Sequence, residues 1–442
     1  MHVSFIYLFH ALLILLQGSN ALQLDRKISS RKPSSRQHSG KKGSNALRAG
    51  VSVTDAEAQA EANRLFDELM SSYKISEGDY FKVGDKKWGT IFNNQMAALK
   101  YCHEAVKKLE AEGARFWDDP EFGPTPDDEH GKASIYFEDV LPGYPDPETI
   151  YWCRPQEIST TKPPEFIDDG ATTNDVIQGT IGDCWLIGGI SVLATNDEYI
   201  RGNFNPTPEA VLEISNEEAE GMVKGIYPPI FHFLRKYGIF VFKLFKNYEW
   251  RYIVIDDKLP CDRQEECPPL LVFGRCRNTN EFWVPLIEKA FAKIHNCYEA
   301  LIAGYLDDAL TDMTGLVSEK VKIQDPKAAI GVDATEALWK KLKGYHEAGT
   351  MLGCSVTGQE GETEHEVEID GEPVGIYKGH AYSIIDIIEL PNPNSQKPHK
   401  SHRLLRLRNP WGQKEWNMKW SDGSPKLMEN LKKLNQVIKE RA

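Results

Sequence analysis

The sequence lacks several features on which large classes of protein depend. None of its eight cysteines forms a C-x-x-C pair, which argues against a structural zinc site. No loop has the Asp-x-Asp-x-Asp-Gly pattern of an EF-hand. The apolar run at residues 3–16 is too short for a comfortable membrane span. Structural zinc proteins and EF-hand proteins are therefore not expected.

One short stretch of the chain is basic, whereas acidic residues outnumber basic ones in the rest of the chain. The whole chain has a net charge of −13, although residues 22–48 hold eight basic residues against the single acidic Asp25. The rest of the chain is therefore strongly acidic, and no aromatic residues alternate with basic ones, so we expect no nucleic-acid partner. Residues 22–50 are rich in Ser, Lys and Arg without periodicity, which predicts a basic disordered linker.

The N-terminus has the pattern of a targeting segment. The apolar run at 3–16 is followed by Ser19-Asn20-Ala21, a small-x-small cleavage pattern, so residues 1–21 resemble a secretory signal peptide. This predicts a protein of the secretory pathway or the extracellular space. No Lys or Arg precedes the run, which leaves open a short membrane anchor or a misassigned start with a cytoplasmic protein. We expect membrane association only through residues 3–16.

The 442 residues are enough for two or three domains with their own cores. Residues 51–115 predict a helical N-terminal region. A capping box at Thr54 and Glu57 opens one amphipathic helix, and residues 94–112 predict a second. We expect the two helices to form a hairpin that packs beside the main domain, with an inhibitory propeptide as the alternative.

Three residues in separate segments suggest thiol chemistry. Cys184 stands between Gly182-Asp183 and a run of small apolar residues, which predicts a helix that starts at the thiol and favours a thiolate. His380 and Asn409 follow far downstream in strand-like segments. This order is that of papain-type enzymes, in which the thiolate attacks, the imidazole transfers the proton and the Asn orients the ring.

These segments resemble calpain, the calcium-dependent cysteine protease. The resemblance runs from about residue 116 to about residue 422 and rests on several motifs in the same order. They are Gln178-Gly-Thr-Ile-Gly-Asp-Cys-Trp185, Gly379-His-Ala-Tyr-Ser383, Arg408-Asn-Pro-Trp-Gly412, Trp152-Cys-Arg-Pro-Gln-Glu-Ile158, Phe166-Ile-Asp-Asp-Gly-Ala-Thr172 and Asn280-Glu-Phe-Trp283.

The resemblance implies an α+β fold with a papain-like core of two subdomains. A helical subdomain at 116–314 would carry Cys184, and an antiparallel β-barrel-like subdomain at 315–442 would carry the His and Asn, with the active site between them. Gln178 would donate its amide to the oxyanion together with the Cys184 N–H. Trp411 would shield the Asn–His bond from water, and in the family the matching Trp obstructs the cleft when calcium is absent.

The resemblance also implies calcium binding. One site would use the backbone carbonyls of Asp168 and Gly170 with the carboxylates of Asp175 and Glu281. A second site would begin with Glu415 and Asp422, but its other ligands would come from a segment beyond Ala442. Residues 426–442 predict a polar helix in place of the family's closing strands, so we expect the second subdomain to be incomplete at its C-terminus.

The sequence thus predicts a calcium-dependent cysteine-type endopeptidase that cleaves internal peptide bonds of protein substrates through a Cys184 thioester. Calcium would activate the enzyme without taking part in the chemistry. The alternative is an inactive or weakly active truncated protein that acts as a binding or regulatory module. A transglutaminase would share the Cys–His chemistry, but it normally has an Asp where Asn409 stands.

Overall fold

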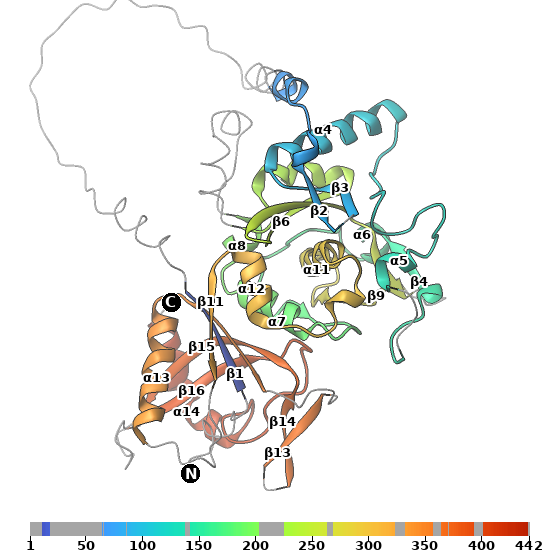
Figure 1. The fold of residues 1–442 in the computed structure, drawn as a ribbon. Coiled ribbons are helices and arrows are strands. Elements are labelled where there is room, and N and C mark those ends of the chain that lie inside the picture. Colours follow the sequence, from blue (N-terminus) through green and yellow to red (C-terminus); the bar gives the residue numbers. More distant parts are fainter. Residues whose placement is uncertain are drawn as a thin grey trace, which may run out of the picture.

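The chain folds into two lobes in a computed structural model, which describes residues 11–17, 64, 66–84, 86–137, 142–202, 225–262, 268–322, 332–356, 364–369, 371–392 and 401–440 (Figure 1). We call the described residues from 64 to 316 the helical lobe. The sheet lobe comprises residues 11–17 and the described residues from 317 to 440. The mixed helices and antiparallel sheets confirm the predicted α+β class.

A four-stranded antiparallel sheet forms one side of the helical lobe. Its order is β2 (Tyr80–Val83), β3 (Lys86–Phe92), β7 (Glu249–Asp256) and β6 (Ile239–Lys246). Strands β6 and β7 are rich in β-branched and aromatic residues, and most of their side chains are buried. The hairpin β2–β3 lies within the region that the sequence predicted to be helical. Residues 51–63, where the first helix was predicted to start, lie outside the described residues.

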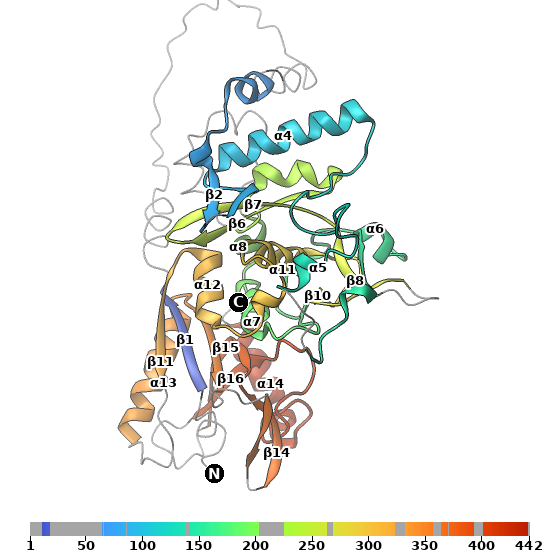
Figure 2. The ribbon, with the colours of Figure 1, turned by 45° about the vertical axis from the view of Figure 1, so that its right-hand side comes forward.

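Helix α4 (Gln95–Glu112) packs beside this sheet (Figure 2). Its start is fixed because the Asn94 side chain accepts a hydrogen bond from the Ala97 N–H. Its end is fixed by Gly113, which adopts a left-handed conformation with φ of 66°. The predicted helix at 94–112 is therefore confirmed.

Two fully buried helices occupy the centre of the helical lobe. Every residue of α7 (Cys184–Leu193) and of α11 (Trp283–Ile294) is buried. The lobe's remaining elements are α5 (Lys132–Ile135), η2 (Pro147–Thr149), β4 (Ile150–Cys153), α6 (Pro155–Ile158), β5 (Val176–Ile177), α8 (Glu198–Arg201), η3 (Pro229–Tyr237), β8 (Leu259–Asp262), β9 (Leu270–Leu271), β10 (Arg275–Cys276), η4 (Glu299–Leu301) and α12 (Leu306–Thr314), with η1 (Glu77–Asp79) before β2.

The sheet lobe is built on a second, mostly antiparallel sheet. Strand β12 (Met351–Val356) pairs with β15 (Ala381–Pro391), which pairs with β16 (Ser401–Arg408). The hairpin of β13 (His365–Ile369) and β14 (Glu372–Lys378) joins β12 through one parallel bridge. Helix α13 (Val332–Glu347) packs on this sheet, and β11 (Val317–Lys322) leads into the lobe. Helix α14 (Pro425–Lys439), which the sequence predicted as a polar helix, has no buried residue.

Part of the N-terminal apolar run also belongs to this sheet. Residues Ala11–Gln17 form β1, which lies between β11 and β12 and pairs with both in antiparallel register. The rest of the predicted signal segment and the predicted linker lie outside the described residues. Within the described ranges, no helix combines the length and apolar character needed to cross a membrane.

The two lobes meet where α7 packs against β15. The Ser383 hydroxyl on β15 donates a hydrogen bond of 2.8 Å to the Gly188 carbonyl on α7. Gly353 lets β12 approach α12 closely, because a Cβ at this position would lie 2.7 Å from the Leu306 side chain. This contact brings the start of α7 beside the start of β15, which follows His380 directly.

Candidate active site

The turn before α7 is held rigidly in place. A Cβ on Gly179 would lie 2.2 Å from the Phe273 backbone, so only glycine fits there. On the other side of Cys184, the Trp185 indole donates a hydrogen bond of 2.7 Å to the Leu301 carbonyl. Cys184 therefore begins α7 at a fixed position, with its side chain largely buried.

His380 and Asn409 lie together beside this helix start. His380 is fully buried, and its Nε2 lies 2.8 Å from Asn409 Oδ1. The Asn409 amide nitrogen donates hydrogen bonds to the carbonyls of Gln413 and Lys414, at 3.0 and 2.9 Å. Because both amide hydrogens are used, Oδ1 must face the imidazole and accept its Nε2–H. This is the ring-orienting contact that the sequence predicted for Asn409.

Trp411 covers this pair. Its ring centroid lies 4.2 Å from that of His380, and its backbone N–H donates a hydrogen bond to Asn409 Oδ1 at 3.0 Å. An apolar cover of this kind keeps water from the Asn–His bond and strengthens it. The arrangement agrees with the shielding role that the sequence predicted for Trp411.

Gln178 lies near the same point, but its amide has another partner. Its Nε2 donates to the Ile181 carbonyl at 2.8 Å, and its backbone N–H donates to the Pro410 carbonyl at 2.8 Å. The buried Oε1 has no hydrogen-bond partner among the described residues. One Nε2 hydrogen therefore remains for an oxyanion, and the backbone bond ties Gln178 to the segment of Asn409.

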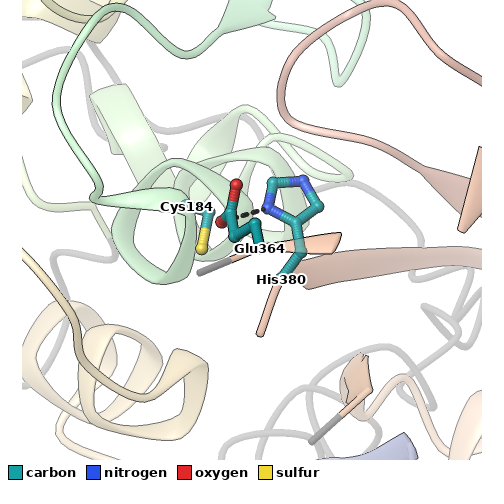
Figure 3. A group of neighbouring side chains, drawn as sticks. All are labelled: Cys184, Glu364 and His380. Carbon is teal, nitrogen blue, oxygen red and sulfur yellow. Dashed lines mark hydrogen bonds and ion pairs between the residues drawn. The ribbon is translucent and has the colours of Figure 1, made fainter. Parts of the chain in front are cut away.

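The sequence did not predict one residue of this site, Glu364. Its Oε1 lies 3.0 Å from His380 Nδ1, the ring nitrogen that Asn409 leaves free. Figure 3 shows the carboxylate beside both the Cys184 sulfur and the imidazole, and the three side chains bring donor atoms within 4.8 Å of one another. The only sequence signal was the acidic segment 362–366 ahead of His380, which has no motif.

The protonation of Cys184 differs from the expectation. Burial raises the pKa of the Cys184 thiol to about 12, and the negative charge of Glu364 adds to the rise. Hydrogen bonding by the Ala381 backbone opposes it only in part. The helix start favours a thiolate, but desolvation has the larger effect here, so the thiol is protonated in this arrangement. The helix start alone would favour the thiolate, whereas burial in this arrangement favours the thiol.

A pair of buried acids includes the residue that precedes Cys184. Burial raises the pKa of Asp183 to about 7, and interaction with Glu288 of α11 limits that rise. Burial and the charge of Asp183 hold the pKa of Glu288 well above its usual range. Both Glu288 oxygens accept from the Gly274 N–H at 2.9 Å. At neutral pH the pair therefore keeps at least one proton.

The first predicted calcium site has a donor without a partner. Glu281 is buried, and its Oε1 accepts a hydrogen bond from the Asp168 N–H at 2.6 Å, whereas Oε2 has no partner in the described part of the chain. Burial raises the pKa of Glu281, and the charges of Asp175, Asp169 and Asp168 raise it further. Gly170 has φ of 103° in an open loop between these acids. A buried unpaired carboxylate oxygen among other acids fits a hard cation.

The second predicted calcium site is much less enclosed. Glu415 and Asp422 are both exposed, and both line a cavity of about 550 Å³ between the β15–β16 side of the sheet and α14. Most other residues lining this cavity are apolar, including Ile376 and Trp416. These two carboxylates alone do not form a rigid oxygen cage.

Comparisons with known proteins agree with this geometry. A family described as calpain family cysteine protease matches residues 117–441. Calpain-5 of Caenorhabditis elegans is 34% identical over 62% of this chain and 40% of its own length. Human calpain-8 is 33% identical over 74% of the chain and 40% of its own length. Rat calpain-9 is 37% identical over 62% of the chain and 33% of its own length.

The chain therefore spans about 40% of the length of the first of these curated relatives. The match covers both lobes, including the start of α7, the His380 segment and the Asn409 turn. The fold, the order of these segments and the family match lead to one conclusion: the chain belongs to the calpain family of cysteine proteases.

Proposed function

We propose that this chain is a cysteine endopeptidase that hydrolyses internal peptide bonds of proteins, with Cys184 as nucleophile. The observation that carries the proposal is the buried His380, which Asn409 orients through Nε2 beside a cysteine at a helix start. Cys184 would pass its proton to Nδ1 as the sulfur attacks the substrate carbonyl. His380 would return the proton to the leaving amine, and water would then hydrolyse the thioester.

The developing oxyanion needs donors at the same point. The Cys184 backbone N–H lies at the free end of α7, and Gln178 keeps one amide hydrogen after its bond to the Ile181 carbonyl. Removal of one such donor in a comparable enzyme costs about 3 kcal/mol in the transition state. Gln178 and the Cys184 N–H are therefore the proposed oxyanion donors.

The described arrangement represents a resting state in this proposal. Glu364 occupies Nδ1, and the Cys184 thiol is protonated. Direct transfer from Cys184 to His380 requires Glu364 to leave Nδ1. The enzyme therefore needs an activation step that moves the Glu364 carboxylate away from His380.

Calcium is the proposed activator. Asp168, Gly170, Asp175 and Glu281 would hold the ion, which when bound supplies positive charge that offsets the repulsion among these acids. Hydrogen bonds connect the loop around Asp175 to the segment of Asn409. Arg408 donates hydrogen bonds to the Asn174 and Val176 carbonyls at 3.3 and 3.0 Å, on either side of Asp175. A change in this loop therefore bears on Asn409, the next residue after Arg408.

The first experiment measures hydrolysis of an unfolded protein carrying a quenched fluorophore, with calcium and with a chelator. We expect hydrolysis only with calcium, and none from Cys184→Ala under either condition. Activity that survives Cys184→Ala would remove this cysteine from the mechanism. A well-folded wild type that is inactive in both conditions supports a non-catalytic binding module.

The second experiment measures calcium binding by calorimetry. Glu281→Ala removes a buried ligand, whereas Glu148→Ala is the control at an exposed carboxylate outside both predicted sites. We expect one site to be lost in Glu281→Ala and kept in Glu148→Ala. Equal calcium binding by wild type and Glu281→Ala would show that Glu281 is not a calcium ligand. Any binding at Glu415 and Asp422 should be weak, because affinity rises with ligand number and rigidity.

We also propose that residues 1–21 are a cleaved secretory signal, on the basis of the apolar run and the Ser19-Asn20-Ala21 pattern. Cleavage after Ala21 removes β1 from the sheet lobe, so the mature chain and the full chain differ in that sheet. N-terminal sequencing of the mature protein should begin near Leu22. A retained Met1 would reject the signal and keep β1 as a strand.

A further inference from the structure

The active site contains a set of side chains with the donors of a transition-metal site. Among the described residues, Cys184, Glu364 and His380 form the one cluster of three such side chains whose ligand atoms all lie within 4.8 Å of one another. The residues proposed for calcium are not part of it. Figure 3 shows the three side chains converging from α7, from the segment before β13 and from the segment before β15.

The donor types are those of a zinc site. Thiolate sulfur, imidazole nitrogen and carboxylate oxygen are the three protein ligands of Zn²⁺, and three of them leave a fourth position for water. Metal–ligand bonds of about 2.0–2.3 Å place tetrahedral donors roughly 3.3–3.8 Å apart. Glu364 Oε1 and His380 Nδ1 are 3.0 Å apart, and no pair exceeds 4.8 Å. The three ligand atoms are therefore close to the separations that a tetrahedral site needs.

The imidazole is already oriented as a ligand. A metal-bound His usually donates its other ring N–H to an oxygen, which fixes the ring and the tautomer. Asn409 Oδ1 accepts that bond from Nε2 at 2.8 Å, so Nδ1 is the nitrogen available to a metal. Both Cys184 and His380 are buried, which limits competition from water.

We propose that Cys184, Glu364 and His380 bind a Zn²⁺-class ion; that such an ion blocks the protease rests on the proposed role of Cys184 as nucleophile. Binding replaces two protons, one from the Cys184 thiol and one from the bond between His380 Nδ1 and Glu364, and involves no redox change. Glu364 supplies the third ligand that a Cys–His pair lacks. The site is distinct from the proposed calcium site in position and in ligand type, and binding of the ion does not depend on catalysis.

Cobalt(II) tests the site because it takes the same ligands and a bound thiolate gives a near-ultraviolet charge-transfer band. The experiment titrates Co²⁺ into the full chain in calcium-free buffer, without substrate. We expect the band in wild type, its loss in Cys184→Ser, and a weakening of Co²⁺ affinity by about 10–100-fold in Glu364→Gln. Zn²⁺ should displace Co²⁺ and abolish the band.

Glu368→Gln is the control, because Glu368 lies on β13, which Glu364 directly precedes, and is exposed. It should bind Co²⁺ as wild type does. A band that persists in Cys184→Ser, or equal affinity in Glu364→Gln and wild type, overturns the proposal. Circular dichroism checks the fold of each variant, and Glu364→Asp, which keeps the carboxylate, should retain the band if Glu364→Gln misfolds. Because no step requires turnover, an inactive protein can still show the band.

Discussion

The helical lobe and the sheet lobe differ in how much of each is core. In the helical lobe, α7 and α11 are buried along their whole length and belong to one continuous apolar cluster. The separate apolar cluster of the sheet lobe contains eleven buried residues within the described ranges, and α14 contributes none. Buried apolar area is the main stabilising term in folding, so we expect the sheet lobe to have the smaller free energy of unfolding.

The residues of the candidate active site are divided between the same two lobes. Cys184 and Gln178 lie in the lobe with the larger core, whereas His380, Asn409 and Glu364 lie in the lobe with the smaller one. Elements with fewer buried contacts open at lower free-energy cost. The proposed nucleophile is therefore held rigidly, and the proposed regulation by Glu364 falls on the lobe that opens at lower free-energy cost.

The largest expected effect is on turnover, and it compares a residue of the helical lobe with a residue of the sheet lobe. Cys184→Ala should lower turnover by about 10⁶-fold, because it removes the reacting atom. Asn409→Ala should lower it by about 10–100-fold, because Asn409 only orients the imidazole. Peptidase assays at saturating calcium measure both. Equal losses in the two variants would show that Asn409 is as necessary as the nucleophile.

The next largest effect compares the two cores. Ile287→Ala on α11 and Ile384→Ala on β15 each remove a buried side chain and should cost about 2–5 kcal/mol. Ile384→Ala should lower the first thermal transition, and Ile287→Ala should lower the second. Calorimetry resolves the two thermal transitions, and hydrogen exchange monitored separately in each lobe shows which lobe each substitution destabilises. A single transition that both variants lower equally would mean that the lobes unfold as one unit.

The buried acids of the helical lobe give a smaller effect that depends on pH. Folding raises the pKa of Asp183 to about 7 and also raises the pKa of Glu288. The protonated pair therefore stabilises the fold fully below the pKa that carboxyl groups have in the unfolded chain, about 4. This stabilisation is lost as pH rises through about 7. Melting temperature should therefore fall over this interval.

Glu288→Gln should reduce that fall, because it removes one titrating group and keeps an oxygen for the Gly274 N–H. The expected difference is about 2–4 °C at neutral pH. Glu148→Gln, at an exposed carboxylate, is the control and should melt as wild type does at every pH. An unchanged pH profile in Glu288→Gln would remove the pair as its cause.

The smallest effect lies within the sheet lobe. Leu431→Ala on α14 should change stability by less than about 1 kcal/mol, because its side chain is 37% exposed. Leu342→Ala on α13, which is 4% exposed, should cost about 2–5 kcal/mol. Thermal denaturation compares them. A large loss in Leu431→Ala would mean that α14 closes the lobe more firmly than its exposure indicates.

The sequence predicted those parts of the fold that depend on local patterns. The helix at 94–112 was predictable because its start has a capping Asn and its end a glycine. The strands β2 and β3 were missed because β3 is held by its pairing with β7, a tertiary contact between residues far apart in the chain, and β2 pairs with β3. Propensity is a weak guide where such a contact decides the structure.

The sequence by itself determined the family and made Cys184, His380 and Asn409 the candidate catalytic residues, because their motifs contain the residue types that thiol chemistry requires. The tertiary structure alone decided the distances among them and the position of Glu364, whose segment has no motif. It also decided the protonation of Cys184, because the pKa of a thiol depends on desolvation and neighbouring charges. Those quantities arise only when residues far apart in the chain are packed together.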